Sequence, residues 1–402
     1  MTASMLHLAD IPPSGLSAEQ AHALVREPLQ EATLTELCSA AAARRDQRYG
    51  DALSFSPKVF LPITTLCRNR CDYCTFRRSP GEDGAHTMSF DEVEAVIAQG
   101  AAIGCTEALL CLGDKPEKAF AAYRRDLTSR GLTSTVDHLV RSSQIALEHG
   151  MWPHTNAGIL DEEDLVRLRP LNASMGLMLE NSSPRLCEKG MPHHRAPDKR
   201  PEVRIAMLEC VGRLKIPFTS GILIGIGETR EERVDSLLVL RDLHLRYGHL
   251  QEIIVQNFRA NPSTVMAASE EPGAADLREA IALARLIMPI DVSVQAPPNL
   301  APGGISMLVN AGVNDFGGVS PLTPDFINPR HPWPHLKQLN LDVQACGKHL
   351  MARLPIYDDW LNEQWVDPGL LPRLQAARAD IERWWPSYGD ALLSPTPLQG
   401  TI

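Results

Sequence analysis

The sequence predicts an α/β protein built as a (β/α)8 barrel, complete or partial, with helical extensions at both ends. Three observations predict this fold. Short β-rich segments alternate with amphipathic helical segments along most of the chain, an order that indicates a parallel sheet of βαβ units. There are seven such units and a candidate eighth, and eight units close a barrel. The length of 402 residues suits one large barrel with additions.

The expected strands are short runs rich in apolar and β-branched residues, each bounded by turn residues. They cover residues 59–65, 107–112, 152–156, 173–179, 218–225, 252–258 and 290–295, and residues 312–315 are the candidate eighth strand. In a barrel of this kind the active site lies at the carboxyl ends of the strands. The residues that follow each strand are therefore the candidates for chemistry.

Helices are expected between these strands, near residues 89–103, 137–149, 161–168, 201–213, 229–246, 274–287 and 303–310. The first of them begins with a capping box, in which Ser89 caps the helix and Glu92 returns a bond to the cap. This signal fixes the start of the helix that follows the first strand.

The first fifty residues are expected to be helical, because Ser17 with Gln20 and Thr33 with Glu36 each form a candidate capping box. The last part of the chain is expected to form helices separated by Pro-rich turns. The chain thus divides into an N-terminal helical extension, a barrel domain and a C-terminal helical extension, covering residues 1–52, 53–344 and 345–402.

Composition excludes several classes of protein. The chain has 44% hydrophobic and 22% charged residues, which is ordinary for a globular protein. Its net charge of -10 argues against a general nucleic-acid surface. No apolar run approaches the roughly 20 residues that a membrane span needs, and no signal-type apolar core stands near the N-terminus. We expect a cytoplasmic protein with neither a nucleic-acid nor a membrane partner.

Three cysteines directly after the first expected strand are the strongest functional signal. Cys67, Cys71 and Cys74 have the spacing C-x3-C-x2-C. Three thiolates hold three irons of a [4Fe–4S] cluster, whereas a fully ligated cluster takes four. The spacing therefore predicts a cluster with one open iron, at which a small molecule binds and reacts. Because the chain follows a strand here, the cluster is expected at the mouth of the barrel.

The alternatives to a cluster are a zinc site and a disulfide framework. Zinc sites usually combine two C-x2-C or similar pairs, and no second pair occurs here. The chain has nine cysteines, an odd number, and it is long enough to form its own core without disulfides. The remaining six are scattered singly along the chain, and we interpret the ones in apolar surroundings as small buried hydrophobic residues.

The cysteine loop, with the aromatic Tyr73 before its third cysteine, resembles that of radical S-adenosylmethionine (SAM) enzymes. The resemblance implies a radical-SAM barrel in which the open iron binds SAM, and it predicts further motifs. Gly113, Asp114 and Glu117 follow the second strand at the place where the superfamily often has a segment that binds the SAM amino group. A strand-ending surface turn is the alternative for this segment.

Two more strand ends match what a SAM site requires. Gly221, Leu223 and Gly225 lie in a segment that resembles the superfamily's G-x-I-x-G-x-x-E, with Leu223 at the Ile position. Glycines at period two leave room for a flat adenine, and a buried strand followed by a turn fits the segment equally well. Glu180 ends the fourth strand, where its carboxylate is a candidate for binding the ribose hydroxyls or the amino group of SAM.

Polar side chains at the other strand ends are candidates for binding a polar heterocycle. These are His154 and Asn156 after the third strand, Gln256 and Asn257 after the sixth, Gln295 and Asn299 after the seventh, and Asn314 and Asp315 at the eighth. By position, His154, Glu180 and Asp315 are the candidate proton-transfer residues. For each one alone, a structural hydrogen-bonding role is equally expected. His193 and His194 are expected in a mobile polar loop, not in a metal site.

Longer stretches narrow the resemblance to one family. The segment from Leu61 to Arg77, together with LGDKPE, PHTNAG, SMGLMLE, TSGILIGIGET, IVQNFRA, APPNL and NDFGGVSPLTPDF, resembles the CofG family of 7,8-didemethyl-8-hydroxy-5-deazariboflavin (FO) synthases. The resemblance spans about residues 55–335. Asp72 stands where the family pattern leads us to expect a glycine.

The family resemblance implies a substrate, partners and a reaction. The substrate is a 4-hydroxybenzyl adduct of 5-amino-6-(D-ribitylamino)uracil, which a partner radical SAM subunit makes from tyrosine. A reductant protein supplies the electron, and SAM and the [4Fe–4S] cluster are the cofactors. The implied chemistry is hydrogen-atom abstraction, ring closure and loss of ammonia. The alternatives are that the chain is the tyrosine-using subunit itself, or a non-catalytic iron–sulfur module.

Overall fold

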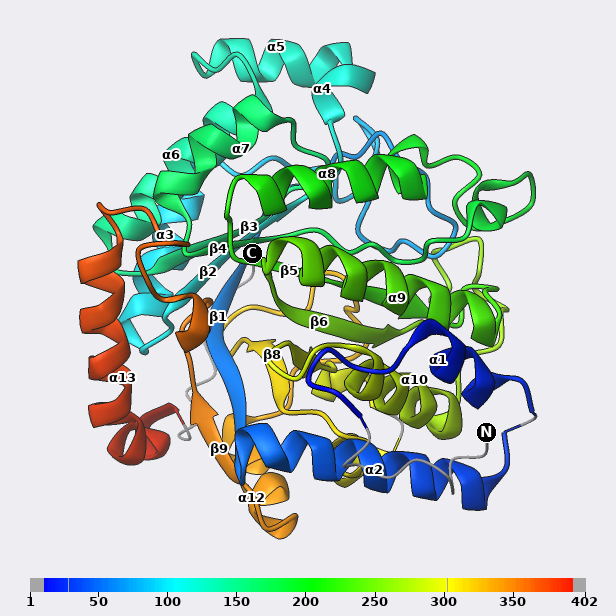
Figure 1. The fold of residues 1–402 in the computed structure, drawn as a ribbon. Helices are drawn as coiled ribbons and strands as arrows, with labels where there is room; N and C mark the ends of the chain where they lie inside the picture. The colour runs from blue at the N-terminus through cyan, green and yellow to red at the C-terminus, as the bar shows by residue number, and fades with distance from the viewer. Residues whose placement is uncertain (1–10, 28, 302, 393–402) are drawn as a thin grey trace.

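Eight parallel strands form a closed barrel in the computed structural model of this chain (Figure 1), which describes residues 11–27, 29–301 and 303–392. Each strand pairs with its neighbour in sequence order, and the first pairs with both the second and the eighth. The strands are β1 (Ala52–Thr64), β2 (Glu107–Leu112), β3 (Trp152–Asn156), β4 (Ser174–Gly176), β5 (Phe218–Ile224), β6 (Leu250–Asn257), β7 (Ser293–Gln295) and β8 (Asp315–Val319). The barrel is therefore complete.

The long strand β1 closes the barrel by pairing with different partners along its length. Its second half, from Lys58 onwards, pairs with β2. Its first half pairs with β8, from Ser54 to Pro57. This offset is the stagger that a tilted, closed barrel requires. The prediction placed only the second half of β1 in a strand.

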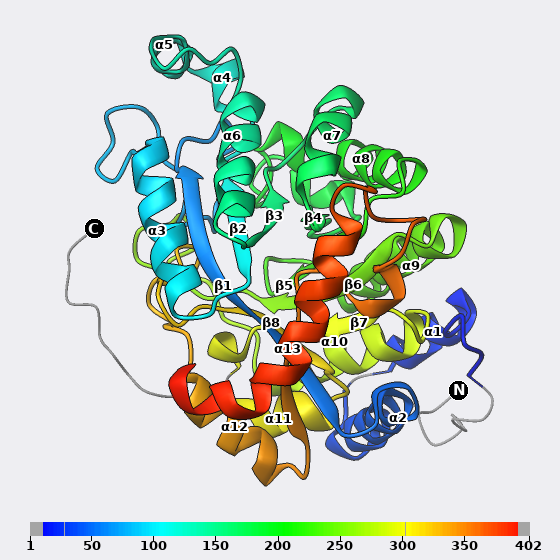
Figure 2. The ribbon, with the colours of Figure 1, turned by 90° about the vertical axis from the view of Figure 1, so that its left-hand side faces the viewer.

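Helices surround the barrel in the predicted order, and apolar side chains of both layers form the core between them. They are α3 (Phe90–Ala102), α6 (Thr135–Glu148), α7 (Glu162–Leu168), α8 (Pro201–Arg213), α9 (Arg230–Tyr247), α10 (Ala274–Ile287) and α11 (Gly304–Asn310). Two short helices that we did not predict, α4 (Pro116–Ala119) and α5 (Ala121–Ser129), project from one side of the molecule (Figures 1 and 2).

The capping predictions are partly confirmed. The Ser89 hydroxyl accepts from the Glu92 N–H at 3.2 Å, and the Ser17 hydroxyl accepts from the Gln20 N–H at the same distance. The box at Thr33 is wrong, because α2 (Glu31–Tyr49) begins two residues earlier with Gln30 as its N-cap. Thr33 therefore lies within the first turn of the helix.

Both extensions cover the barrel, but the C-terminal one is not purely helical. Helix α1 (Ala18–Val25) packs on α9, and α2 packs along α10 (Figure 1). After α12 (Leu336–Ala345), a short strand β9 (His349–Ala352) pairs in parallel with the first residues of β1, and α13 (Leu371–Leu392) follows beside α12 (Figure 2). Four residues carry too little pattern to predict this strand, and pairing with β1 forms it.

The segment after β9 closes the base of the barrel. Arg353 forms ion pairs with Asp315 at 2.6 Å and with Glu252 at 3.0 Å, and the Tyr357 hydroxyl donates to Glu252 at 2.7 Å. All four side chains lie at the amino ends of the strands, away from the mouth. The base is therefore filled by a polar network in which the acids have partners.

The eighth strand differs from its predicted position, and the difference moves two predicted site residues. Gly312 has a φ of 106° and belongs to the preceding turn, whereas the strand begins at Asp315. The prediction took Asp315 as the end of the strand. The strand instead passes through Gly317 and Gly318, because Gly317 with a φ of 68° forms a bulge within it.

Candidate active site

The three cysteines of the motif line one cavity at the mouth of the barrel. Cys67, Cys71 and Cys74 all contribute to its wall, and its volume is about 240 Å³. The other wall residues come from the rest of the cysteine loop, from the carboxyl ends of β2, β3, β5 and β6, from the loops after β4 and β8, and from the start of α8. The predicted placement of the cysteines at the mouth is confirmed.

Close contact with the end of β2 holds the first cysteine. The Asp114 N–H donates to the Cys67 sulfur at 3.1 Å. A Cβ atom on Gly113 would lie 2.5 Å from the Cys67 Cβ and 2.2 Å from the Leu66 carbonyl oxygen. A side chain at position 113 would therefore push the cysteine loop away from the strand.

The cysteine set fits an iron–sulfur cluster. N–H···S hydrogen bonds such as the one to Cys67 are a normal feature of thiolate ligands to clusters. Burial raises the pKa of the Cys67 and Cys71 thiols to about 12, so metal binding has to displace their protons. Among the described residues, no three His, Cys, Asp or Glu side chains are gathered to hold a single metal ion. A cluster differs in taking one thiolate on each of three irons.

Residues 182–200, between β4 and α8, form a segment, here called the strap, that holds the cysteine loop by hydrogen bonds and ion pairs. Arg68 donates two hydrogen bonds to Asp198, one of them at 2.6 Å, and Arg195 pairs with Asp72 at 2.9 Å. The backbone also contributes to this contact, because the Arg70 N–H donates a hydrogen bond to the Arg195 carbonyl at 3.0 Å. Asp72, the departure from the family pattern, thus anchors the strap.

His193 lies under this strap and is not part of an open polar loop. It is 3% exposed, and its Nε2 lies 3.0 Å from the Tyr73 hydroxyl. Burial lowers the pKa of His193 to about 2, so the imidazole is neutral at physiological pH. The prediction of a mobile loop is wrong here, since residues distant in sequence supply the packing.

Two acidic side chains of the predicted SAM site line the cavity, each with a basic partner. The Asp114 carboxylate accepts from the Ile159 N–H at 2.8 Å, and Arg204 lies 3.7 Å away. Burial raises the pKa of Asp114. Glu180 forms an ion pair with Lys199, and its backbone is left-handed with a φ of 66°. Strained backbone of this kind is concentrated at functional sites.

Glu117 does not reach the cavity. It lies in α4, and its carboxylate accepts from the Thr135 hydroxyl at 2.7 Å. The chain turns away from the mouth immediately after Asp114, because Lys115 adopts a left-handed conformation with a φ of 36°. Sequence spacing did not reveal this turn.

The segment with the period-two glycines forms one apolar wall. Leu223 lines the cavity, and it packs with a small cluster of side chains beside Tyr73 (Leu186, Ile226, Phe258, Met191, Ala260 and Met266). A Cβ on Gly221 would lie 2.1 Å from the Ile254 carbonyl oxygen, and one on Gly225 would lie 2.5 Å from Pro272. These glycines therefore permit close packing, and neither of them lines the cavity.

Three of the predicted amides face the cavity. Asn156, Gln256 and Asn257 belong to its wall. Asn257 donates to the Leu300 carbonyl at 3.0 Å, but its side-chain oxygen is buried without a partner. The Gln256 side chain has no hydrogen bond among the described residues. These amides retain hydrogen-bonding capacity for a ligand.

Other predicted polar residues do not line the cavity, and most of their hydrogen bonds are made within the protein, although the Asn299 side-chain oxygen is buried without a partner among the described residues. Asn299 donates to Asp325 and to the His331 carbonyl, at 2.9 and 2.8 Å. Asn314 accepts from the Val294 N–H at 2.8 Å near the base. Asp315 also lies at the base, where it pairs with Arg353 as described above. The shifted eighth strand explains the positions of Asn314 and Asp315.

His154 and Gln295 lie inside the barrel but outside the cavity wall. The His154 Nδ1 is 2.7 Å from the Ser174 hydroxyl. Burial lowers the pKa of His154 to about 4, so it is neutral at physiological pH. Gln295 is 7% exposed and pairs across the sheet with Asp315.

Several wall residues were not predicted. They include Asn69, Cys111, Lys199, Arg204 and Asn328. Most come from loops or from the start of a helix, where no strand-end rule applies. The basic residues among them carry no local signal, since only the fold brings them beside Asp114 and Glu180.

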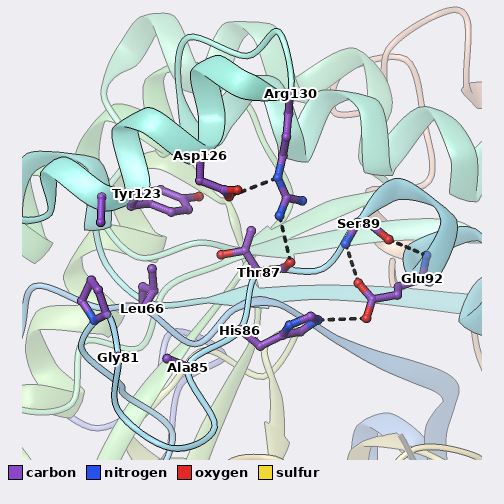
Figure 3. A pocket seen from close by; sticks show the side chains of 12 residues that line it. Leu66, Gly81, Ala85, His86, Thr87, Ser89, Glu92, Tyr123, Asp126 and Arg130 are labelled. Atoms are coloured by element: carbon purple, nitrogen blue, oxygen red, sulfur yellow. Dashed lines mark hydrogen bonds and ion pairs between the residues drawn. The ribbon is translucent and has the colours of Figure 1, made fainter.

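A larger hollow of about 390 Å³ lies outside the barrel between the cysteine loop and α5 (Figure 3). Its polar groups bind one another: His86 pairs with Glu92 at 3.0 Å, and Arg130 pairs with Asp126 at 3.1 Å (Figure 3). Arg130 also donates to the Thr87 carbonyl. The hollow therefore lacks the free polar groups of the cysteine cavity, which remains the candidate site.

Comparisons with solved structures agree with the barrel. Methylornithine synthase (PylB) superposes with a TM-score of 0.67 at 20% identity, covering 86% of this chain and 98% of the other. The FeFe-hydrogenase maturase HydG from Carboxydothermus hydrogenoformans gives 0.68 at 18% identity, covering 96% and 87%. At this identity the likeness shows the fold. No helix among the described residues meets the length and apolarity that a membrane crossing requires.

Sequence comparisons identify the family. Residues 61–240 match the Radical SAM superfamily. The 7,8-didemethyl-8-hydroxy-5-deazariboflavin synthase of Methanopyrus kandleri is 47% identical over 78% of this chain and 94% of its own length, and that of Methanoregula boonei is 46% identical over 82% and 97%. The FO synthase of Streptomyces coelicolor is 43% identical over 92% of this chain but only 44% of its own length. Radical SAM enzymes use a [4Fe–4S] cluster and SAM, so these are the cofactors of this chain, which belongs to the 7,8-didemethyl-8-hydroxy-5-deazariboflavin synthase family.

Proposed function

We propose that this chain forms FO, the deazaflavin chromophore of coenzyme F420, by closing the central ring of the hydroxybenzyl adduct of ribityl uracil. The reaction consumes one SAM and releases methionine, 5′-deoxyadenosine and ammonia. The observation that supports it is the joint lining of one cavity by three motif cysteines, an apolar wall and free amides. Relatives that carry this name match along nearly their whole length.

When bound, the cluster and SAM supply the adenosyl radical that removes a hydrogen atom from the substrate. Cys67, Cys71 and Cys74 hold the cluster. Glu180 and Asp114, with Lys199 and Arg204, place charges of both signs on the wall beside it, which suits the amino and carboxylate groups of SAM.

Leu223 and Tyr73, on the apolar wall, would hold the adenine of SAM. The hydrogen bond between the Tyr73 hydroxyl and His193 fixes the orientation of the Tyr73 ring, which lines the cavity. The role that the resemblance gave to Gly221 and Gly225 becomes indirect: they allow the strand and turn that carry Leu223 to pack closely.

On the substrate side, Asn156, Gln256 and Asn257 bind the ring and its ribityl chain. Among the candidate proton-transfer residues, Glu180 alone lines the cavity, so it is the one we retain for proton transfer at the mouth. His154 is neutral and stands one level lower in the barrel, where it is suited to hydrogen bonding.

We infer two protein partners. The FO synthase of Streptomyces coelicolor is more than twice as long as its match to this chain, and we infer that a second radical SAM unit, which acts on tyrosine, supplies the adduct. A reductant protein supplies electrons across the outer face of the cysteine loop. There Arg70, Arg77, Arg78 and Arg195 line a hollow of about 500 Å³ beside Cys71 and Cys74. Three acids share this hollow, and Arg77 and Arg195 are paired with two of them, Glu82 and Asp72, so among the described residues Arg70 and Arg78 supply the unpaired positive charge here, on a chain of net charge -10.

The test is turnover of the purified, anaerobically reconstituted protein. Reduced enzyme with SAM is given either the preformed adduct or tyrosine plus ribityl uracil. Deazaflavin fluorescence from the adduct alone supports the proposal. Consumption of free tyrosine by this chain would instead identify it as the partner subunit, and failure to cleave SAM with a full cluster would indicate a non-catalytic module.

A further inference from the structure

Two polar side chains inside the barrel are buried without a hydrogen bond or ion pair among the described residues. Lys58 on β1 is 8% exposed, and Gln295 at the end of β7 is 7% exposed. The Trp333 indole nitrogen beside Lys58 is likewise buried without a partner. Buried polar groups of native proteins are almost always hydrogen-bonded, so each of these calls for an explanation.

The strand pairing points Lys58 into the barrel. Its neighbour Val59 faces outward, where its Cγ1 lies 2.4 Å from the place a Cβ on Gly100 of α3 would take. Successive residues of a strand face opposite sides, so Lys58 and Phe60 face the interior. On the β2 side, Lys58 is the register partner of Glu107, the first residue of β2, so it stands near the amino end of that strand, deep in the barrel.

The Lys58 ammonium lies between aromatic rings. Its Nζ is 4.8 Å from the centre of the Trp333 ring and 5.7 Å from that of Phe60. The carboxylates of Glu107, Asp325 and Glu252 attract it from beyond ion-pair distance. A buried ammonium without a direct counter-ion destabilises the fold, and an apolar side chain of similar volume would not.

The eighth strand is shaped around these two side chains. A Cβ on Gly318 would lie 2.2 Å from the Lys58 Cδ, and one on Gly317 would lie 1.8 Å from the Gln295 Nε2. Gly317 forms the bulge in β8, and bulges often adjust side-chain positions next to active sites. Both glycines are therefore needed to keep Lys58 and Gln295 in the interior.

Cys111 connects the part of the barrel interior that holds Lys58 with the cysteine cavity. It lines the cavity, and both Lys58 and Cys74 lie near enough to its thiol to influence its pKa. Lys58 is not part of the cavity wall, and its register partner Glu107 precedes Cys111 by four residues on β2, so Lys58 stands below the cavity, on the side facing away from the mouth. A substrate that lies beneath SAM would meet Lys58 and Gln295 with its lower edge.

We propose that Lys58 and Gln295 form the floor of the substrate site and bind the pyrimidinedione edge of the substrate. The Lys58 ammonium donates to a ring carbonyl oxygen. The Gln295 amide, which both donates and accepts, pairs with the adjacent N–H and carbonyl of the same ring. The inference rests on the proposed function, because it takes the substrate to be the ribityl uracil adduct.

The test uses the reconstituted holoenzyme with SAM and compares Lys58→Met, Gln295→Leu and Gly318→Ala with the wild type. Iron content and SAM binding verify that each variant is folded and loaded. Binding of 5-amino-6-(D-ribitylamino)uracil, which carries the ring without the phenol, is measured by calorimetry. We expect Lys58→Met to weaken this binding at least tenfold, to raise KM for the adduct more than it lowers kcat, and to release more 5′-deoxyadenosine per FO.

Gly318→Ala retains the lysine but displaces it, so it is expected to weaken binding of the ribityl uracil in the same direction. Lys337→Met, on an exposed lysine of α12, is the matched control and is expected to bind as the wild type does. Ribityl uracil binding within threefold of wild type in a loaded Lys58→Met enzyme would overturn the inference. A wild-type enzyme that makes no FO from the adduct would instead refute the proposed function.

Discussion

The mouth and the base of this barrel both contain polar side chains, but those at the base are hydrogen-bonded within the protein, whereas, among the described residues, several at the mouth are not. At the base, the two Glu252 oxygens accept from Thr219, Tyr357 and Arg353, and Asp315 is held by Arg353 as well. At the mouth, Gln256 and the Asn257 oxygen remain free, and the cysteine sulfurs have few partners.

This difference teaches how to separate structural from functional polar groups in one barrel. Acids and amides whose hydrogen bonds are all taken up by the protein stabilise the fold, and those with spare capacity bind ligands. Asp315 and Gln256 were equal candidates by residue type. Their partners, not their chemistry, distinguish them.

Among substitutions in the two regions, Cys67→Ala at the mouth is expected to have the largest effect on FO formation. The variant loses one iron ligand, so it should fail to hold a complete cluster, and FO formation should fall by more than roughly a thousandfold, beyond the effect of a single oriented catalytic group. Iron analysis and FO fluorescence measure the two effects. Cys346→Ala, at the end of α12, is the control and should retain both. A Cys67→Ala enzyme with a full complement of iron and normal turnover would remove the cysteines from the site.

At the base, Arg353→Met is expected to affect stability first. It leaves the Asp315 and Glu252 carboxylates buried without their cation, which costs about 3–5 kcal/mol. The free energy of unfolding from urea titration measures the loss, with the exposed Arg330→Met as the control. A loss below about 1 kcal/mol would show that the base does not depend on its ion pairs.

His154 connects the two regions, and its titration should be visible in the pH dependence of stability. Its pKa is about 4 in the folded protein because of burial, against about 6.5 when unfolded. Between these values the unfolded state binds more protons, so this contribution to stability is present above pH 6.5 and is lost as pH falls toward 4. The loss is about 2 kcal/mol by pH 5.

Urea titrations from pH 7 to pH 4.5 test this contribution. His154→Gln should show a shallower decline in the free energy of unfolding than wild type, and the exposed His335→Gln should not. Equal slopes for the wild type and His154→Gln would mean that His154 is solvated in the folded protein.

The smallest effect is expected on the outer face of the mouth. Arg70 is exposed beside Cys71, and its side chain makes no hydrogen bond among the described residues. With an acidic flavodoxin as reductant at low salt, Arg70→Glu should lower the rate of FO formation about 3–10-fold, in the range of electrostatic effects on association. With dithionite the rate should match wild type. Arg330→Glu is the control for surface charge. An equal loss of FO formation with both reductants would place Arg70 in the catalytic cavity instead.

The sequence predicted well what depends on local pattern. Strands such as Glu107–Leu112 and helices such as Ala274–Ile287 agree with their predicted bounds, because apolar periodicity and caps are local signals. The eighth strand was misplaced, because its glycine pair resembles a turn until the bulge and the interior side chains that need it are known. Strand β9 carried no signal of its own.

By itself the sequence determined the cluster site and the barrel, since three ligands within eight residues after a strand need no knowledge of distant contacts. Only the tertiary structure decided which polar residues face a ligand. It placed Asp315 and Asn314 at the base, removed Glu117 from the site, and brought Lys199 and Arg204 beside the acids of the cavity wall. The physical reason is that the height of a side chain in a barrel depends on the register and stagger of paired strands, which join segments far apart in the chain.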